Sequence, residues 1–322
     1  MEFTMGGRLE VHITPDDVGK RVSVRTIATQ GEGSARFTDT VGVLTSWAGG
    51  VLSITRRNGE MIRHEEATVV AGKTVPAAPA RRRGTPAAGV AELVGVAGRG
   101  WPGVETERVG DWRLNAAAGW TARANSAYRV GPGAPEVDRI REWYAARGLP
   151  ARLQVTTGAG DSDELLDAAL ERAGWRAEKF ALLRVAPLAP LADREPDARV
   201  QVHRELSGTW LAGYPRHREA PDTVREVLTG GPSVWFATVP GAAVARCVVD
   251  GRWAGFAAVE VGAAHRRRGL ATALMAELAR TALAEGASAA YLQVETGNSA
   301  ARAVYDRLGF TDHHHYHYRT AP

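Results

Sequence analysis

Residues Gly255–Thr272 read GFAAVEVGAAHRRRGLAT, an apolar run that passes into a basic, glycine-bearing loop and then into a second apolar pattern. The first run is typical of a buried strand, and leucines at helical spacing indicate a helix over Gly269–Glu285. Backbone N–H groups at such a junction meet the positive end of the helix dipole, and Gly269 lets the chain approach a ligand closely. The stretch therefore predicts a binding site for a pyrophosphate.

An internal repeat surrounds this stretch. Arg152–Gly158 reads RLQVTTG and Leu170–Trp175 reads LERAGW, while Tyr291–Gly297 reads YLQVETG and Tyr305–Phe310 reads YDRLGF. Both copies follow the order strand, turn, helix, glycine and aromatic residue, which predicts two βαβα units on mainly parallel strands. The alternative is coincidence in a chain rich in alanine and arginine.

The two copies differ at the loop between strand and helix. The first copy has GPGAPEVD at 131–138, whereas the second has GAAHRRRGLAT at 262–272. Only the second copy offers a basic loop at the start of a helix, so we expect chemistry in that copy and a structural role for the first.

The N-terminal region has a different pattern. Short β-branched runs at 21–29, 40–46, 51–56 and 68–71 are separated by turn signals at Gly49-Gly50 and Asn58-Gly59. This pattern predicts a small antiparallel barrel or a curled sheet, and it resembles a small SH3-like β-barrel. We expect that barrel at 8–74, a linker at 75–89 that contains Arg81–Arg83, a degenerate half at 90–192 and a catalytic domain at 193–322. The linker arginines are interpreted as solvated rather than phosphate-binding.

Three elements of the second copy agree in order and spacing with a known family. They are the strand end Val259-Glu260-Val261, the loop Arg266-x-x-Gly269-x-Ala271, and Asn298 followed seven residues later by Tyr305 and then Gly309-Phe310. In these elements the chain resembles the GNAT (GCN5-related) acyl-CoA N-acyltransferases, over about residues 200–320. The resemblance implies an α/β (α+β) fold of tandem GNAT-like mixed sheets with flanking helices, preceded by the barrel.

The resemblance also implies ligands and roles. The donor would be acetyl-CoA or another acyl-CoA, and the acceptor an amine-bearing small molecule or peptide. Backbone groups of Val259 and Val261 would hold the pantetheine arm and the thioester carbonyl, Asn298 would bond the pantetheine, and Tyr305 would face the sulfur as general acid. The pyrophosphate would lie on the loop residues Arg266, Arg267, Arg268, Gly269, Leu270, Ala271 and Thr272.

The sequence does not decide which residue is the general base. Glu260 and Glu295 are the nearest carboxylates by sequence, and a water relay to Glu260 is one solution. Some relatives carry a glutamate five residues before the asparagine, but here that position is Gln293. Two residues have structural alternatives: Tyr305 as a core aromatic and Asn298 as a simple helix N-cap.

The histidine-rich tail DHHHYHYR at 312–319 reads as a final strand with His313, His315 and His317 on one face. Because three imidazoles on one face can bind a metal ion, a metal site is an alternative interpretation of this tail. We nevertheless expect no metal. The single cysteine, Cys247, lies in an apolar run and should be buried, so thiol chemistry is not expected.

Composition limits the partners and the compartment. The chain has 322 residues, a formal charge of +4 and only three lysines among its 40 basic residues, a skew typical of codon bias. We therefore expect no nucleic-acid partner, no membrane segment, a cytoplasmic location and a monomer or homodimer. Two other functions stay open: an acyl-CoA sensor that transfers nothing, and acyl transfer to a non-amine acceptor.

Overall fold

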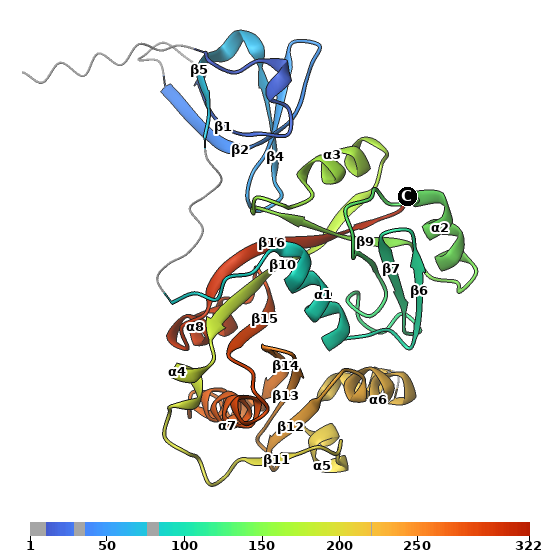
Figure 1. Cartoon of the computed structure of the whole chain (residues 1–322), viewed down its shortest axis with the longest axis vertical. Coiled ribbons are helices and arrows are strands. Elements are labelled where there is room, and N and C mark those ends of the chain that lie inside the picture. Colours follow the sequence, from blue (N-terminus) through green and yellow to red (C-terminus); the bar gives the residue numbers. More distant parts are fainter. Residues whose placement is uncertain (1–10, 29–35, 76–83, 220) are drawn as a thin grey trace, which may run out of the picture. The chain divides into compact units, whose positions relative to one another are not determined.

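The computed structural model describes residues 11–28, 36–75, 84–219 and 221–322 (Figure 1). Contacts divide the chain into two compact units, residues 1–80 with 155–173 and residues 81–154 with 174–322. The linker arginines at 81–83 and the first residues of the predicted barrel lie outside the described residues. No helix in the described ranges is long and apolar enough to cross a bilayer.

The first unit contains a five-stranded antiparallel sheet with the order β4-β3-β2-β1-β5. The glycine turns are confirmed, because Gly49, Gly50 and Gly59 have positive φ values of 59°, 76° and 84°. The elements are η1 (Pro15–Asp17), β1 (Arg21–Ala28), β2 (Arg36–Ala48), β3 (Val51–Thr55), β4 (Met61–Glu65), η2 (Glu66–Thr68), β5 (Val69–Thr74) and α3 (Glu164–Arg172).

Of the two forms that the strand spacing allows, a small barrel or a curled sheet, the described part of this unit shows an open sheet. Strands β4 and β5 are the two edges of the sheet, so the ladder stays open. Closure requires tilted edge strands that meet, and these edges are only five and six residues long. A small core of buried aliphatic side chains packs on one face of the sheet: Ile13, Val22, Val24, Leu44, Leu52 and Ile54.

The strands of the second unit belong to one 11-stranded sheet with the order β11-β12-β13-β14-β15-β10-β16-β9-β8-β7-β6, in which β9 from Val155 onward is counted with the first unit. Parallel pairing joins β14 to β15 and β8 to β9, whereas β10 is antiparallel to both of its neighbours. The expectation of mainly parallel strands within the repeats is therefore wrong, whereas the mixed sheet with flanking helices that the resemblance implied is confirmed. Its strands are β6 (Glu105–Val109), β7 (Trp112–Ala116), β8 (Ala127–Arg129), β9 (Arg152–Thr157), β10 (Arg176–Pro187), β11 (Gln201–His203), β12 (Val234–Val239), β13 (Ala243–Asp250), β14 (Trp253–Val261), β15 (Ala289–Glu295) and β16 (Thr311–Thr320).

Helices cover both faces of this sheet. Neighbouring residues of β14 and β15 alternate between two apolar clusters, since Ala254, Phe256 and Leu292 belong to one and Trp253 and Tyr291 to the other. The first face carries α4 (Ala189–Ala192), α7 (Leu270–Ala284) and α8 (Ser299–Arg307), and the opposite face carries α1 (Val90–Gly100), α5 (Gly208–Ala212) and α6 (Pro221–Thr229) (Figure 1). The remaining helical elements are α2 (Val137–Ala145), η3 (Pro215–Glu219) and η4 (Ala263–His265).

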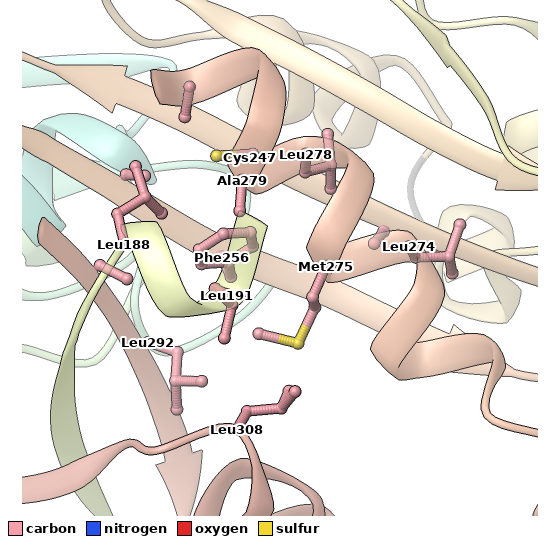
Figure 2. Packing of buried hydrophobic residues seen from close by; sticks show 14 of the residues in the cluster. Leu188, Leu191, Cys247, Phe256, Leu274, Met275, Leu278, Ala279, Leu292 and Leu308 are labelled. Atoms are coloured by element: carbon pink, nitrogen blue, oxygen red, sulfur yellow. The ribbon is translucent and has the colours of Figure 1, made fainter. Parts of the chain in front are cut away.

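The core beneath α7 confirms the helix predicted there. Leu274, Met275 and Leu278 of α7 lie in one buried cluster with Phe256 and Leu292 of the sheet (Figure 2). Cys247 lies in the same cluster with no exposed surface, and burial raises the pKa of its thiol to about 12. The thiol is therefore protonated and unreactive at neutral pH, as expected from the sequence.

One strand that follows the first sequence repeat is exchanged into the sheet of the second. Strand β10, which follows the first repeat, lies between β15 and β16 of the second. Its Arg184 is 6% exposed and forms ion pairs with Asp306 at 2.6 Å and Asp312 at 2.7 Å. The same guanidinium donates to the carbonyl of Phe310 at 2.9 Å. Arg184 thereby holds the end of α8 and the start of β16 on the exchanged strand.

We expect Arg184→Met to lower the free energy of unfolding by about 1–3 kcal/mol, because it leaves the buried carbonyl of Phe310 without its donor and removes the bonds of a buried guanidinium. The control is Arg99→Met, since Arg99 is 48% exposed and pairs with Asp250 at 2.7 Å. An exposed pair contributes about 1 kcal/mol or less. Thermal and urea unfolding of both variants measure the difference, and equal losses would contradict the assigned role of Arg184.

Candidate functional site

The centre of the site is a split between β14 and β15. The parallel pairing runs from Trp253–Ala289 to Phe256–Leu292, although β14 continues to Val261. Just beyond the last pair, Ala258 has a φ of +50° and the β13–β14 register shifts. A bulge of this kind bends a strand and ends its pairing. The last five residues of β14 are accordingly only half-buried.

The loop after β14 is shaped as an anion-binding nest. Arg267 and Gly269 have φ values of +61° and +75°, and Gly269 is the N-cap of α7. Throughout the described chain, the amides from Arg267 to Thr272 find no hydrogen-bond acceptor. A Cβ built on Gly269 would meet nothing within 4 Å. Unused amides, open space and a helix N-terminus at one loop suit a pyrophosphate.

Asn298 caps α8 beside the end of β15. Its side-chain oxygen accepts a hydrogen bond from the amide of Ala301 at 3.0 Å. The capping role considered from the sequence is thus present, and the Asn298 side-chain nitrogen is not used by that bond. Capping fixes the start of α8, which carries Tyr305 two turns later.

Tyr305 on α8 is close enough to Glu260 on β14 for the charge of the carboxylate to act on the tyrosine hydroxyl. Burial and the negative charge of Glu260 raise the pKa of Tyr305 to about 12, partly offset by Arg184. Tyr305 also packs edge-on against Phe310, with ring centroids 5.9 Å apart. Its hydroxyl is therefore a proton-bearing donor at neutral pH, and its ring is part of the core, so the two sequence interpretations are compatible.

Glu260 lies on the face of β14 opposite α7, because its neighbours Val259 and Val261 both pack on the α7 side. Burial raises the pKa of the Glu260 carboxyl above its ordinary value, and Arg216 and Arg266 pull that pKa back down. A carboxylate that has lost part of its hydration is a stronger base than one in bulk water. Arg216, on η3, has no motif signal in the sequence and was not among the predicted site residues.

The other polar candidates lie differently. Glu295 is exposed at the end of β15, where its charge raises the pKa of Tyr316 on β16. Gln293 is two residues earlier, and within the described residues its buried Oε1 has no hydrogen-bond partner. This oxygen is therefore free to accept a hydrogen bond from a ligand or a bound water.

The predicted final strand is confirmed as β16, with His313 and His314 joined through their Nδ1 atoms at 2.9 Å. His313 also bonds the carbonyl of Ala88 through Nε2 at 3.0 Å. Among the residues that the structure describes, no group of three histidine, cysteine or acidic side chains is arranged to hold a metal ion.

In the first repeat, the loop between β8 and α2 is filled by a side chain. Asp111 accepts a hydrogen bond from the amide of Gly133 at 2.8 Å. A Cβ on Gly131 would come within 2.4 Å of the same carboxyl group. A carboxylate therefore occupies the turn that corresponds to the nest after β14, and no anion has room there.

The amino-acid sequence of the chain is similar to those of proteins named as acetyltransferases. A family model described as "Probable histone acetyltransferase Rv0428c C-terminal" matches residues 87–319. A Mycobacterium tuberculosis protein named "Probable histone acetyltransferase Rv0428c" is 30% identical over 313 residues, which are 94% of this chain and 95% of that protein. The Bacillus subtilis protein named "Uncharacterized N-acetyltransferase YobR" is 26% identical and covers 70% of this chain and 95% of its own length.

Solved structures share the fold. A GCN5-related N-acetyltransferase from Kribbella flavida has a TM-score of 0.53 and 18% identity, and the match covers 73% of this chain and 97% of that one. A tandem GNAT protein from the clavulanic acid biosynthesis pathway has a TM-score of 0.51 and 16% identity, covering 74% and 90%. At these identities the likeness concerns the fold alone.

Proposed function

The chain belongs to the Rv0428c-type branch of the GNAT N-acetyltransferases, and from that premise we propose that it transfers an acetyl group from acetyl-CoA to a primary amine at the β14–β15 split. The observation that carries the proposal is the split itself, which lies directly before the loop of unused amides. The two repeats are interpreted as tandem halves of which only the second is catalytic, because Asp111 fills the loop of the first.

The residues present fit a CoA thioester. The amides from Arg267 to Thr272 would bind the pyrophosphate, with Arg266–Arg268 adding positive charge. Backbone groups of Val259 and Val261 lie beyond the last β14–β15 pair and would bind the pantetheine arm, with Asn298 contributing its side-chain amide. When bound, the thioester supplies the activated acyl group that a neutral amine attacks.

Tyr305 is proposed as the general acid that faces the sulfur. Its pKa of about 12 keeps the hydroxyl protonated, whereas an ordinary thiol has a pKa of about 8.5. Complete proton transfer from Tyr305 is therefore uphill, and its main contribution is a hydrogen bond to the sulfur as negative charge develops there.

Glu260 is proposed as the general base, directly or through one water. It is half-buried, its pKa is raised, and it lies at the bulge where the strands separate. Glu295 is exposed and is the second candidate. A base at Glu260 would take the proton that the attacking amine loses and hand it to solvent.

A thiol-release assay tests the function. With acetyl-CoA and a panel of amines that includes lysine-bearing peptides, we expect release of CoA that depends on the amine, together with an acetylated product seen by mass spectrometry. The name of the M. tuberculosis relative makes a basic protein one acceptor to include. No release with any amine, or no binding of acetyl-CoA by calorimetry, would contradict the proposal.

We expect Gly269→Val to weaken acetyl-CoA binding about tenfold, since a β-branched residue disfavours the left-handed φ of +75° by about 1–2 kcal/mol and shifts the amides of the nest. Gly286→Val is the matched control, because Gly286 has a φ of +92° and equally open surroundings at the other end of α7. Calorimetry should show weaker binding for the first variant alone, with similar thermal destabilisation of both.

A further inference from the structure

Two guanidinium groups lie over one tryptophan on the face opposite α7. Arg123 lies 4.6 Å and Arg246 lies 5.3 Å from the ring centroid of Trp101. Arg246 is completely buried, and its three nitrogens donate to the carbonyls of Leu228, Gly100 and Gly230 at 2.6, 2.7 and 2.5 Å. In the described chain, the partly buried guanidinium of Arg123 has neither a hydrogen-bond acceptor nor a carboxylate partner. All of its donors are available.

Among the described residues, no ion pair joins Arg123 or Arg246 to a carboxylate. Burial, together with the nearby charge of Arg123, lowers the pKa of Arg246 to about 10. Of the carboxylates that act on this region, Asp250 pairs with Arg99 at 2.7 Å. Glu295 acts on Tyr316, yet it makes no ion pair with Arg123. Two cations around one aromatic ring, neither bonded to a carboxylate, create a preference for an anion.

A second donor that has no partner within the described chain belongs to another residue that contacts Trp101. Trp120 is 4% exposed and stacks on Trp101 with ring centroids 5.7 Å apart, and within the described residues its Nε1 has no acceptor. The indole nitrogens of its neighbours are satisfied, since Trp101 donates to Thr121 at 3.2 Å and Trp210 to Ala245 at 3.0 Å. A buried N–H without a partner is costly, so its presence points to a ligand that accepts from it.

The loop that carries both donors is rigid. The Asn125 carboxamide accepts from the amides of Ala117 and Gly119 at 2.8 and 2.9 Å and donates to the carbonyls of Trp120 and Thr121 at 2.7 and 2.8 Å. Thr121 has a φ of +60°, a strained value for a β-branched residue that tends to occur at functional sites. The donors are therefore held in place before any ligand arrives.

The two donors lie on the same side of the sheet as the proposed transfer site. Trp101 and Trp120 belong to an apolar cluster against which Ala257 and Ala258, at the bulge next to Glu260, are packed. A ligand group on Arg123 and Trp120 would thus lie on the side of the sheet to which Glu260 belongs. The loop comes from the first repeat, so that repeat would contribute to substrate recognition.

We propose that Arg123 and the indole N–H of Trp120 form an anion subsite for the acceptor, and that the acceptor is a primary amine that also carries a carboxylate. The inference rests on the proposed function for the identity of the amine as acceptor. A planar guanidinium and a single N–H are complementary to the oxygens of a carboxylate. The positive surroundings disfavour an acceptor whose neighbouring groups are cationic.

The test is direct binding, without turnover. Glycine, β-alanine and 6-aminohexanoate place the amine and the carboxylate at three spacings, and each is titrated beside its primary amide into the CoA-saturated chain by calorimetry. For at least one spacing we expect the acid to bind about 10- to 100-fold tighter than the amide, because a hydrogen bond to a charged group contributes that much.

Variants assign the effect to the subsite. Arg123→Gln should abolish the preference for the acid, and Trp120→Phe, which keeps the ring and loses the donor, should reduce it. Arg141→Gln removes the same charge from an exposed position of α2 and should preserve the preference. Thermal unfolding checks that each variant is folded, and Arg123→Lys, which retains the charge, guards against a purely steric loss.

Other outcomes overturn the inference. Equal binding of acid and amide at every spacing, a preference that survives Arg123→Gln, or tighter binding of a lysine-rich peptide than of any acid would each do so. Failure of the proposed function would look different: no amine would be acetylated, while the acid and amide titrations would still decide whether Arg123 binds a carboxylate.

Discussion

Replacing Tyr305 with phenylalanine is expected to lower kcat about 100- to 1,000-fold and to leave the affinity for acetyl-CoA unchanged, because the hydroxyl acts only where negative charge develops on sulfur. The ring packs against Phe310, and phenylalanine preserves that contact. Single-turnover kinetics together with the equilibrium Kd for acetyl-CoA separate the chemical step from binding.

A matched control is Tyr144→Phe. The Tyr144 hydroxyl donates to the carbonyl of Asn115 at 2.9 Å in the first repeat, away from the split. That variant should lose thermal stability and keep its turnover number. If Tyr305→Phe turned over at the wild-type rate, Tyr305 would be a core residue only, and another donor would have to serve the sulfur.

The strand–loop–helix junction could be predicted because its signals are local. The apolar run up to Val261, the glycine at the start of α7 and the leucine spacing after it are each readable within one turn or strand. The structure confirms the helix at Leu270–Ala284 and the strand at Trp253–Val261. The shape of the nest followed from Gly269, whose positive φ is a property of the residue type.

Features that depend on distant residues could not be predicted in this way. The bulge at Ala258 occurs in the run Ala257-Ala258-Val259, whose side chains carry no turn signal. The insertion of β10 between β15 and β16 depends on pairing between residues more than a hundred positions apart. Strand spacing in the N-terminal region left a barrel and a curled sheet as alternatives, because spacing does not determine whether two edge strands meet.

The acceptor side was missed for a related reason. Arg123 and Trp120 lie on a loop of the repeat that lacks the phosphate nest, and nothing in their spacing distinguishes them from the other arginines and tryptophans of the chain. What distinguishes them is the absence of partners for their donors, and this property exists only in the folded structure.

Replacing Glu260 with glutamine should lower kcat/KM about 100- to 10,000-fold, the usual contribution of a positioned general base. Glu295→Gln is the control, because it removes the other candidate carboxylate from an exposed position. If the second variant lost activity and the first did not, the base would be Glu295.

The pH profile tests the same assignment without relying on the size of a rate change. Burial raises the pKa of Glu260, so its carboxylate form is lost as the pH falls through a value above the usual 4.3 or so of glutamate. The amine must also be neutral, and the rate of the wild type should therefore fall more steeply below the Glu260 pKa than above it. In Glu260→Gln the steeper limb should vanish.

Arg216 and Arg266 lower the pKa of the same carboxyl group, so Arg216→Gln should move the steeper limb of the profile to higher pH. An unmoved limb would mean that the limb belongs to another group.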